Sequence, residues 1–391
     1  MARLRNKARS DNRVQGKVYL GRGEDGKKKY KYVYAANNAE LQKKLDEQKT
    51  LLGKGIDITA ERDTFKQWGD MWLSLKETQV SHSQYIAYRS HFSKFEPIYN
   101  IPVSKLRQTD FQRIITELGS RDKPLSAKTL QGVKQTAQQI MRLAIANRVI
   151  DFNCADNLII PKTAKEPEHK RALTDEEQRW IRETPHRAQT AAMIMMYAGL
   201  RRGELLALTW SDIDLDGRTI SVNKAVEFID DKPRVKNCGK SDAAMRTVFI
   251  PQILIDYLRE VPRKTLIVCP NTKGKTMSKT SWDLMWKSYI KELNIKWGDF
   301  DNLIGKRPTS KFQPGGVPII IPSITAHWLR HTFVTNLYFA GVDLVTAKDQ
   351  AGHSDIRTTT EIYTHLNDEH RAAKMKAVDD YFDKINATKI C

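Results

Sequence analysis

The pattern of apolar and polar positions separates a short alternating region at the start of the chain from long stretches with helical spacing. Residues 16–20 and 27–34 alternate polar and apolar side chains on either side of Asp25-Gly26, an arrangement typical of a β-hairpin. A stretch with helical spacing follows near residues 38–49. We therefore expect a small N-terminal β-sheet, of three strands in all, packed against one helix.

The two faces of this predicted sheet differ in chemistry. Tyr30, Tyr32 and Tyr34 share one face of the second strand, and we expect that face to pack on the helix while the lysines point to solvent. A basic sheet of this kind is suited to enter a DNA major groove, as β-ribbon proteins do. The alternative is a solubilised sheet whose lysines contact nothing. The candidates for DNA contact in this region are Lys17, Arg22, Lys28, Lys29 and Lys31.

The region from about residue 60 to 160 has the spacing of an all-helical domain. The predicted helices cover residues 64–75, 83–99, 109–119 and 126–147. In the last of these, apolar side chains fall on one side and basic or amide side chains on the other. The polar side is either an ordinary solvated face or a surface that contacts DNA. Its candidates for DNA contact are Lys128, Lys134 and Arg142.

A polar segment with two prolines, residues 161–171, is typical of an interdomain linker. A capping-box pattern at Thr174 opens the next helical region, which short strands at residues 218–222 and 245–250 interrupt. The sequence thus predicts a multidomain, mainly α protein. Its predicted parts are residues 1–58, a helical domain at 59–160, the linker at 161–171, and a mixed α+β domain at 172–391.

Composition and charge narrow the function of these domains. The chain of 391 residues is 40% hydrophobic and has a formal net charge of +19, which points to a polyanionic partner. Residues 1–35 carry eleven basic and three acidic residues, so this short region holds +8 of that charge. The sequence has no run of about 18 apolar residues, and its basic N-terminus lacks the apolar stretch of a secretory signal. We expect a cytoplasmic protein without membrane contact.

Arginine and histidine residues recur in a pattern suited to a phosphodiester. His327 and Arg330 are three residues apart and project from one side of a predicted helix. Arg201 precedes a helical run, a common position for a phosphate contact. A guanidinium binds two oxygens and keeps its proton, so arginines can neutralise the charge that develops on a phosphate under attack. Each motif alone is weak evidence for a phosphate site. Arg201, for example, is equally able to pair with Glu204.

Tyr363 is the candidate nucleophile. Gly352 is predicted to end a helix in a left-handed cap, which places His353 at a turn ten residues before Tyr363. The ordinary pKa of tyrosine, about 10, leaves little phenolate at neutral pH, so a nucleophilic tyrosine needs cationic or basic neighbours. For any one of the thirteen tyrosines a structural role is the default. The surrounding motif distinguishes this tyrosine from the others.

The order and spacing of these motifs resemble the tyrosine recombinases, the integrases of phages and conjugative transposons. The resemblance covers the predicted C-terminal domain. It implies that Arg201 and Arg330 clamp the scissile phosphate. It also implies that His327 and His353 hydrogen-bond the phosphate or move the proton of the nucleophile. Tyr363 would then form a 3′-phosphotyrosyl bond with the DNA.

The same resemblance adds a lysine to the set. In the family, a lysine in a β-hairpin protonates the leaving 5′ oxygen and precedes a strand similar to residues 246–250. Lys240 stands at the corresponding distance, with Lys236 as a rival, and Phe249 occupies a position where proline is usual. The chemistry needs neither ATP nor a metal ion, so no cofactor is expected. The four cysteines are also too widely spaced for a zinc site.

The resemblance further implies an architecture and partners. It implies an arm-type DNA-binding domain, a helical core-binding domain and a catalytic domain acting on double-stranded DNA at core crossover sites and arm sites. A tetramer on DNA is expected, in which an amphipathic helix at residues 367–385 docks on a neighbouring subunit; the alternative is packing on its own core. An excisionase and a DNA-bending host protein are further expected partners, and the bacterial nucleoid is the expected location.

Two other functions fit part of the pattern. A type IB topoisomerase uses a similar constellation to relax DNA, but relaxation requires no accessory DNA-binding domain. A non-catalytic DNA-binding regulator requires no complete set of arginines, histidines and tyrosine. The sequence therefore favours a site-specific recombinase of a mobile element that carries out integration and excision.

Overall fold

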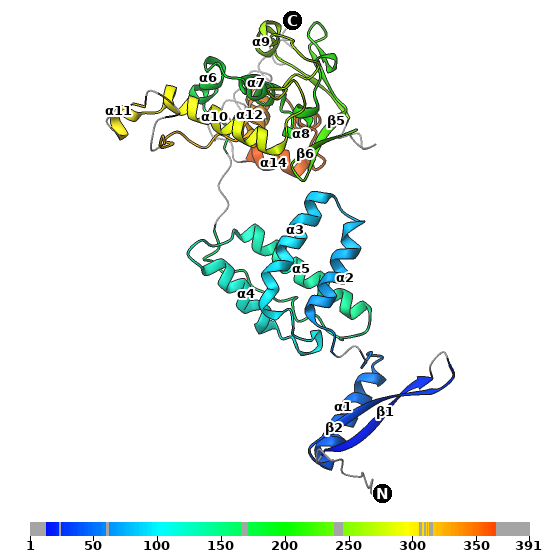
Figure 1. Cartoon of the computed structure of the whole chain (residues 1–391). Coiled ribbons are helices and arrows are strands. Elements are labelled where there is room, and N and C mark those ends of the chain that lie inside the picture. The colour runs from blue at the N-terminus through cyan, green and yellow to red at the C-terminus, as the bar shows by residue number, and fades with distance from the viewer. Residues whose placement is uncertain are drawn as a thin grey trace, which may run out of the picture. The chain divides into compact units, whose positions relative to one another are not determined.

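The computed structural model describes residues 13–22, 25–59, 62–165, 171–237, 245–304, 307–308, 310, 312 and 316–364; of Glu361, Tyr363 and Thr364 it describes the backbone alone. Its contacts divide the chain into two compact units, Met1–Glu168 and His169–Cys391 (Figure 1). Each unit has a hydrophobic core formed by its own residues. Helices predominate in both, so the mainly α class is confirmed. None of the helices in the described residues is long and apolar enough to cross a membrane.

The first unit begins with an antiparallel hairpin, β1 (Val14–Arg22) and β2 (Lys28–Ala35), and a helix, α1 (Asn38–Gly53), that packs on it (Figure 1). The Asn37 side chain caps α1 by accepting a backbone hydrogen bond from its first turn. Hairpin and helix lie where the sequence predicts them. The described residues form two of the three expected strands, and residues 1–12 lie outside the described part.

The helix packs on the face of the hairpin opposite to the expected one. Val18 is buried, and Gly16 makes room for Leu45, whose Cδ1 would lie 2.9 Å from a Cβ at the glycine. Lys31 pairs with Val18 across the hairpin and therefore faces the helix, whereas Tyr32 is 53% exposed. The prediction that the tyrosine face contacts the helix is wrong. The small side chains on the other face allow the closer approach.

In residues 62–165 four α-helices form a bundle, and the short 3-10 helices η2 and η3 connect its second and third members. Their bounds are α2 (Phe65–Glu77), α3 (His82–Phe92), η2 (Ser93–Ile98), η3 (Val103–Lys105), α4 (Gln108–Ser120) and α5 (Ala127–Ala146). The core is aromatic: the ring centroid of Phe65 lies 5.6 Å from that of Phe95 and 5.4 Å from that of Phe111. The four predicted helices are confirmed. The second is shorter than expected because the chain passes into a 3-10 helix that contains Pro97.

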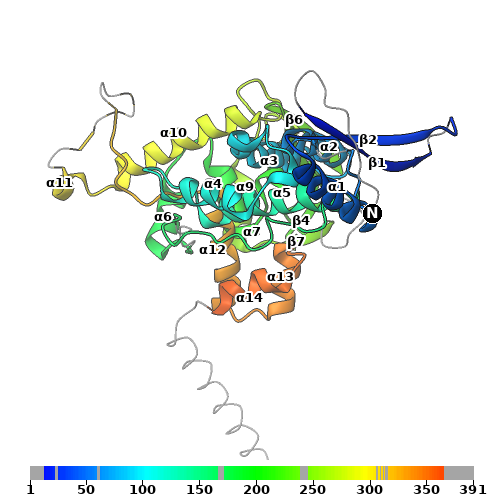
Figure 2. The ribbon, with the colours of Figure 1, turned by 90° about the horizontal axis from the view of Figure 1, so that it is seen from below.

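The second unit is built around α7 (Gln189–Ala198), which is buried along most of its length. The helix α12 (Ala326–Phe339) packs along it. Figure 2 shows α13 (Leu344–Ala351) and α14 (Ile356–Thr364) side by side beyond α12. The other α-helices among the described residues are α6 (Asp175–Glu183), α8 (Arg202–Ala207), α9 (Gln252–Glu260), α10 (Lys279–Trp297) and α11 (Phe300–Leu303).

The strands of the second unit form two small antiparallel sheets in its described residues. Their members are β3 (Ile213–Asp214), β4 (Thr219–Val222) and β7 (Arg246–Phe249), in the order β3-β4-β7, and the hairpin of β5 (Lys224–Ile229) and β6 (Lys232–Asn237). A 3-10 helix, η4 (Trp210–Asp212), precedes β3. The two predicted strands, β4 and β7, are confirmed and pair with each other. The apolar pattern did not predict this hairpin, because β6 is polar on both faces; only the resemblance implied a hairpin before β7, and Lys236, the rival of Lys240, lies on β6.

Candidate active site

Arg201 stands at the start of α8, directly after a glycine turn. The preceding helix α7 ends at Gly199, whose φ of 62° is left-handed. A Cβ at Gly199 would lie 2.2 Å from Cδ1 of Phe333 on α12, so the turn requires glycine for two reasons. Beyond it, Arg201 is the N-cap residue of α8, and 43% of its side chain is exposed. The close packing of α7 on α12 thereby fixes the position of Arg201 at the start of α8.

Arg330 enters the same site from α12. The residue is 5% exposed, and its two terminal nitrogens donate to the backbone oxygens of Gly199 and Ala351. Burial, and after it the charge of Arg201, lower the pKa of Arg330 to about 9, so the guanidinium remains charged at neutral pH. The two backbone contacts fix its plane before a substrate binds.

Three arginines meet at the C-terminal end of α13. Three successive carbonyl groups, those of the last two residues of the helix and of its glycine cap, each accept a hydrogen bond from a different guanidinium. The pairs are Gln350 with Nε of Arg246 at 3.2 Å, Ala351 with Arg330, and Gly352 with Arg201. A helix end suits these cations because its last carbonyls lack intrahelical partners and carry partial negative charge. The predicted left-handed cap at Gly352 is confirmed, with φ 64°.

Glu204 on α8 joins two of the three arginines. Its side chain is 6% exposed, and its Oε1 accepts from Nη1 of Arg201 at 2.7 Å and from Nη1 of Arg246 at 3.1 Å. Its Oε2 accepts from the backbone of Arg201 and from Nη2 of Arg246, both at 2.9 Å. Burial raises the pKa of Glu204, but the hydrogen bonds and charges of both arginines outweigh burial and lower it to about 2. The carboxylate is therefore ionised at every physiological pH.

His353 lies half-buried at the turn after α13. Its Nδ1 is 2.8 Å from Oγ1 of Thr359 on α14. Burial, followed by the charges of Arg330 and Arg201, lowers the pKa of His353 to about 4. The imidazole is therefore neutral at pH 7 and able to accept a proton. His327 stands exposed in the first turn of α12 and adds to the same repulsion.

The structure brings together four of the six predicted catalytic residues: Arg201, His327, Arg330 and His353. The backbone of Tyr363 lies near the end of α14, so its predicted place on the helix after the His353 turn is confirmed. Lys240 lies outside the described residues, in the segment between β6 and β7. Arg246 was missed as a site residue, since the sequence identified it only as the start of a strand.

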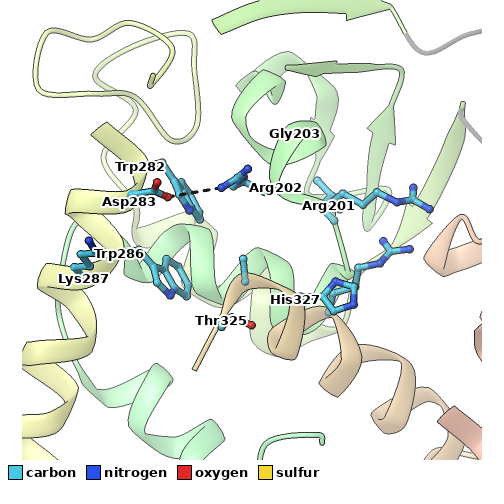
Figure 3. Close-up of a pocket in the computed structure, with 12 residues that line it drawn as sticks. Arg201, Arg202, Gly203, Trp282, Asp283, Trp286, Lys287, Thr325 and His327 are labelled. Carbon is cyan, nitrogen blue, oxygen red and sulfur yellow. Dashed lines mark ion pairs between the residues drawn. The ribbon is translucent and has the colours of Figure 1, made fainter. Parts of the chain in front are cut away.

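A cavity of about 640 Å³ adjoins the cluster. Figure 3 shows Arg201 and His327 at one end and the tryptophans of α10, Trp282 and Trp286, at the other. Arg202 turns away from Arg201: it pairs with Asp283 at 3.8 Å. Of the two adjacent arginines, only Arg201 joins the cluster at α13.

The predicted DNA-contacting residues differ in their surroundings. The amine of Lys31 donates to Oε1 of Gln48 at 2.8 Å and to the carbonyl of Ile58 at 2.5 Å. The amine of Lys134 donates to the carbonyl of Leu158 at 2.6 Å. These two lysines thus tie together parts of their own unit. The other candidates are all exposed, and they are Lys17, Arg22, Lys28, Lys29, Lys128 and Arg142.

Comparison with known sequences yields a family and several relatives. The sequence model of the phage integrase family matches residues 166–370, more than half of the chain. The chain is 27% identical over 387 residues to a tyrosine recombinase XerC-like protein of Caldanaerobacter subterraneus subsp. tengcongensis, covering 93% of this chain and 95% of the relative. It is 24% identical over 284 residues to the ICEBs1 integrase of Bacillus subtilis (strain 168), covering 70% and 69%.

Solved structures share the fold. The Tn1549 transposon integrase in complex with transposon right end DNA matches with a TM-score of 0.64 at 19% identity, over 81% of this chain and 99% of that chain. A lambda integrase dimer bound to a COC′ core site matches with a TM-score of 0.53 at 15% identity, over 92% and 94%. At such identities the likeness shows a common fold.

Proposed function

Because this chain belongs to the phage integrase family and is a tyrosine recombinase, we propose that it cuts and rejoins DNA at specific sites through Tyr363. The observation that carries the proposal is the convergence of Arg201 and Arg330 on the end of α13 beside a neutral His353. In this cluster three guanidinium groups face one carboxylate, that of Glu204. The resulting excess of positive charge suits a phosphodiester.

In the proposed reaction the hydroxyl oxygen of Tyr363 attacks the scissile phosphorus. A bond forms between that oxygen and phosphorus as the bond to the 5′ oxygen breaks, which leaves a 3′-phosphotyrosyl link. Arg201 and Arg330 neutralise the charge that grows on the non-bridging oxygens. Since Thr359 holds Nδ1 of His353, the Nε2 of that histidine is assigned to the phosphate or to the tyrosine proton.

Lys240 is proposed to give its proton to the leaving 5′ oxygen, and His327 to hydrogen-bond the phosphate. In rejoining, a 5′ hydroxyl attacks the phosphotyrosyl link, displaces Tyr363 and returns a proton to the lysine. The covalent link keeps the energy of the phosphodiester bond, so this cycle requires no ATP.

The proposed layout assigns residues 1–58 to arm-site DNA, 59–160 to core-site DNA, 161–171 to a linker and 172–391 to catalysis. The exposed basic residues of the hairpin and of α5 are the proposed contacts to DNA phosphates. The outward tyrosine face of the hairpin, including Tyr32, extends this surface. Lys31 and Lys134 are assigned to the stability of their own unit.

We further propose that the recombined DNA is a mobile element, in integration and excision. Similarity to the ICEBs1 integrase and the shared fold of the Tn1549 transposon integrase support this proposal. A tetramer on DNA, with residues 367–385 docked on a neighbouring subunit, belongs to the same proposal, as do an excisionase, a DNA-bending host protein and the nucleoid as location. Lambda integrase, which shares the fold, has been crystallised as a tetramer bound to a Holliday junction.

The test is covalent capture on a nicked suicide duplex that carries the recombination site of the element. Wild-type protein is expected to form an adduct that survives denaturation and migrates with both protein and DNA. The Tyr363→Phe variant is the matched control, since it loses one oxygen. Binding without an adduct by the wild type would contradict strand transfer, and an adduct formed by the phenylalanine variant would contradict the choice of nucleophile.

A further inference from the structure

We propose that Arg246 is a positioning residue, which sets the geometry of the catalytic cluster through Glu204 and through the last turn of α13. The inference rests on the proposed strand-transfer function. It adds a third arginine to the two that are proposed to hold the phosphate, and it gives that arginine a different task.

Arg246 is enclosed by protein. Its side chain is 6% exposed, its two terminal nitrogens donate to Glu204 at 3.1 and 2.9 Å, and its Nε donates to the carbonyl of Gln350 at 3.2 Å. Gly352 covers the guanidinium, since a Cβ there would lie 2.7 Å from Nη1 and 2.8 Å from Cζ. A guanidinium so enclosed acts on its neighbours and has no open side for a DNA phosphate.

The first group that Arg246 positions is the carboxylate of Glu204. A bidentate pair fixes the plane of a carboxylate as well as its distance. The same carboxylate receives Nη1 and the backbone N–H of Arg201 at 2.7 and 2.9 Å. Without Arg246 the carboxylate would be free to turn toward Arg201 alone, and the closer pair would draw that arginine away from the phosphate.

The second group is the turn that carries His353. The strand β7 is tied to the last turn of α13 at both of its ends. At one end Nε of Arg246 reaches the Gln350 carbonyl, and at the other the backbone N–H of Phe249 donates to Oε1 of Gln350 at 2.9 Å. His353 stands three residues after Gln350. The position of β7 therefore sets the position of the histidine, and β7 directly follows the segment that contains Lys240.

The test replaces Arg246 by methionine, which keeps much of the length and removes the charge and the fork. The rate constant of adduct formation is measured on the nicked suicide duplex at saturating protein, beside duplex affinity and melting temperature. We expect the rate constant to fall by about 100-fold, the loss typical of a misplaced catalytic group, with duplex affinity unchanged. Lys224→Met is the matched control, since it breaks a 2.8 Å ion pair to Asp212, whose side chain is 8% exposed. This variant is expected to lower the melting temperature and to leave the rate constant unchanged.

A pH profile separates positioning from a loss of stability. Burial comes first among the causes that hold the pKa of His353 low, and the charges of Arg330, Arg201, Arg246 and His327 follow. These groups face the imidazole from α12, α8 and β7, and Thr359 faces it from α14. Removing Arg246 removes one repelling charge, so the acidic limb of the cleavage profile is expected to move to higher pH. Lys224→Met is expected to leave that limb in place.

A double-mutant cycle tests the path through the carboxylate. If Arg246 acts through Glu204, then Arg246→Met combined with Glu204→Gln is no slower than the slower single variant. Rate losses that multiply would overturn this path.

Failure of the positioning role and failure of the proposed strand-transfer function give different experimental results. A folded, DNA-bound Arg246→Met that cleaves at the wild-type rate with the wild-type pH profile would overturn the positioning role. A wild-type protein that forms no adduct would overturn strand transfer itself. Should the methionine variant not fold, Arg246→Lys carries the test, because lysine keeps the charge and lacks the fork. We expect the lysine variant to cleave more slowly than wild type, and an unchanged rate would overturn the role of the fork.

Discussion

Replacing Gly199 by alanine probes the turn that arranges both of the arginines proposed to clamp the phosphate. The glycine ends α7 with φ 62°, and its carbonyl accepts a hydrogen bond from Arg330. An added Cβ would lie 2.2, 2.7 and 2.9 Å from three ring carbons of Phe333. That ring is 5% exposed and belongs to the core of the unit, so it has no open space to enter.

Two costs add in this substitution. A left-handed backbone costs an L-residue about 1–2 kcal/mol, and forcing an extra carbon into a packed core costs about 1–3 kcal/mol. Gly199→Ala is therefore expected to lower the free energy of unfolding by about 2–5 kcal/mol. Gly274 is the matched control, because its φ is 75° and its nearest contact would be Cγ2 of Thr265 at 3.2 Å. Gly274→Ala carries mainly the backbone cost, about 1–2 kcal/mol.

Urea unfolding of the two variants measures this difference, and the suicide duplex measures its effect on cleavage. Gly199→Ala is expected to slow adduct formation as well, since moving Phe333 shifts α12, which carries His327 and Arg330. Gly274→Ala is expected to cleave at the wild-type rate. Equal losses of unfolding free energy in the two variants would refute the argument from the Phe333 contact.

Three further predictions concern charged groups. Glu204→Gln is expected to lower the free energy of unfolding by about 3–5 kcal/mol, the usual cost of breaking a buried ion pair. The folded pKa of Glu204 is about 2 against an ordinary 4.5, so the wild type loses this stability as pH falls from about 4.5 toward 2. In thermal melts over that pH range, the variant is expected to lose less stability than the wild type. The folded pKa of His353 is about 4 against an ordinary 6.5, so the unfolded chain takes up the proton first and stability falls as pH drops from 6.5 toward 4; melts of His353→Gln are expected to show a shallower fall. Lys31→Met is expected to lower the melting temperature and to leave the salt dependence of duplex affinity unchanged. Lys29→Met is expected to leave the melting temperature unchanged and to reduce the slope of log affinity against log salt concentration by about 0.9. Thermal melts and anisotropy titrations at several salt concentrations check both variants.

The helices were predictable because their signals are local. The capping boxes at Thr64 and Thr174 and the apolar spacing behind them lie within a few residues of each other, so sequence alone contains them. The signal that decides which face of the N-terminal hairpin packs on α1 is not local in this sense. Alternation on β2 defines two faces, but a glycine on the other strand, Gly16, decides which face admits Leu45.

The candidate site was predictable from sequence where its motifs are local, as the helices were. The motifs around Arg201 and Arg330 and the turn at Gly352 are short and ordered in sequence. From the sequence, a pair between Arg201 and Glu204 is the alternative to a phosphate contact. In the structure that pair exists, and one nitrogen of Arg201 reaches the end of α13 at the same time. Arg246 could not be found from sequence, since its partners lie 42 and 104 residues away.

Lysines are harder to assign from sequence than arginines for the same reason. A lysine amine at the end of a flexible stem binds any acceptor that the fold brings within reach. Lys31 reaches a carbonyl 27 residues away and Lys134 reaches one 24 residues away. Neither acceptor is recognisable from sequence, so exposure and charge were the only guides.

A cluster of three arginines requires acceptors, because like charges repel: the charges of Arg201 and Arg246 both act to lower the pKa of Arg330. One carboxylate, that of Glu204, supplies part of the compensation. The rest comes from backbone carbonyls at the ends of α7 and α13, and both helices end at left-handed glycines, Gly199 and Gly352. Carbonyl dipoles orient a guanidinium without cancelling its charge. The compensation is thus sufficient to fix the arginines and incomplete enough to leave attraction for a phosphate, which a second carboxylate in place of those carbonyls would remove.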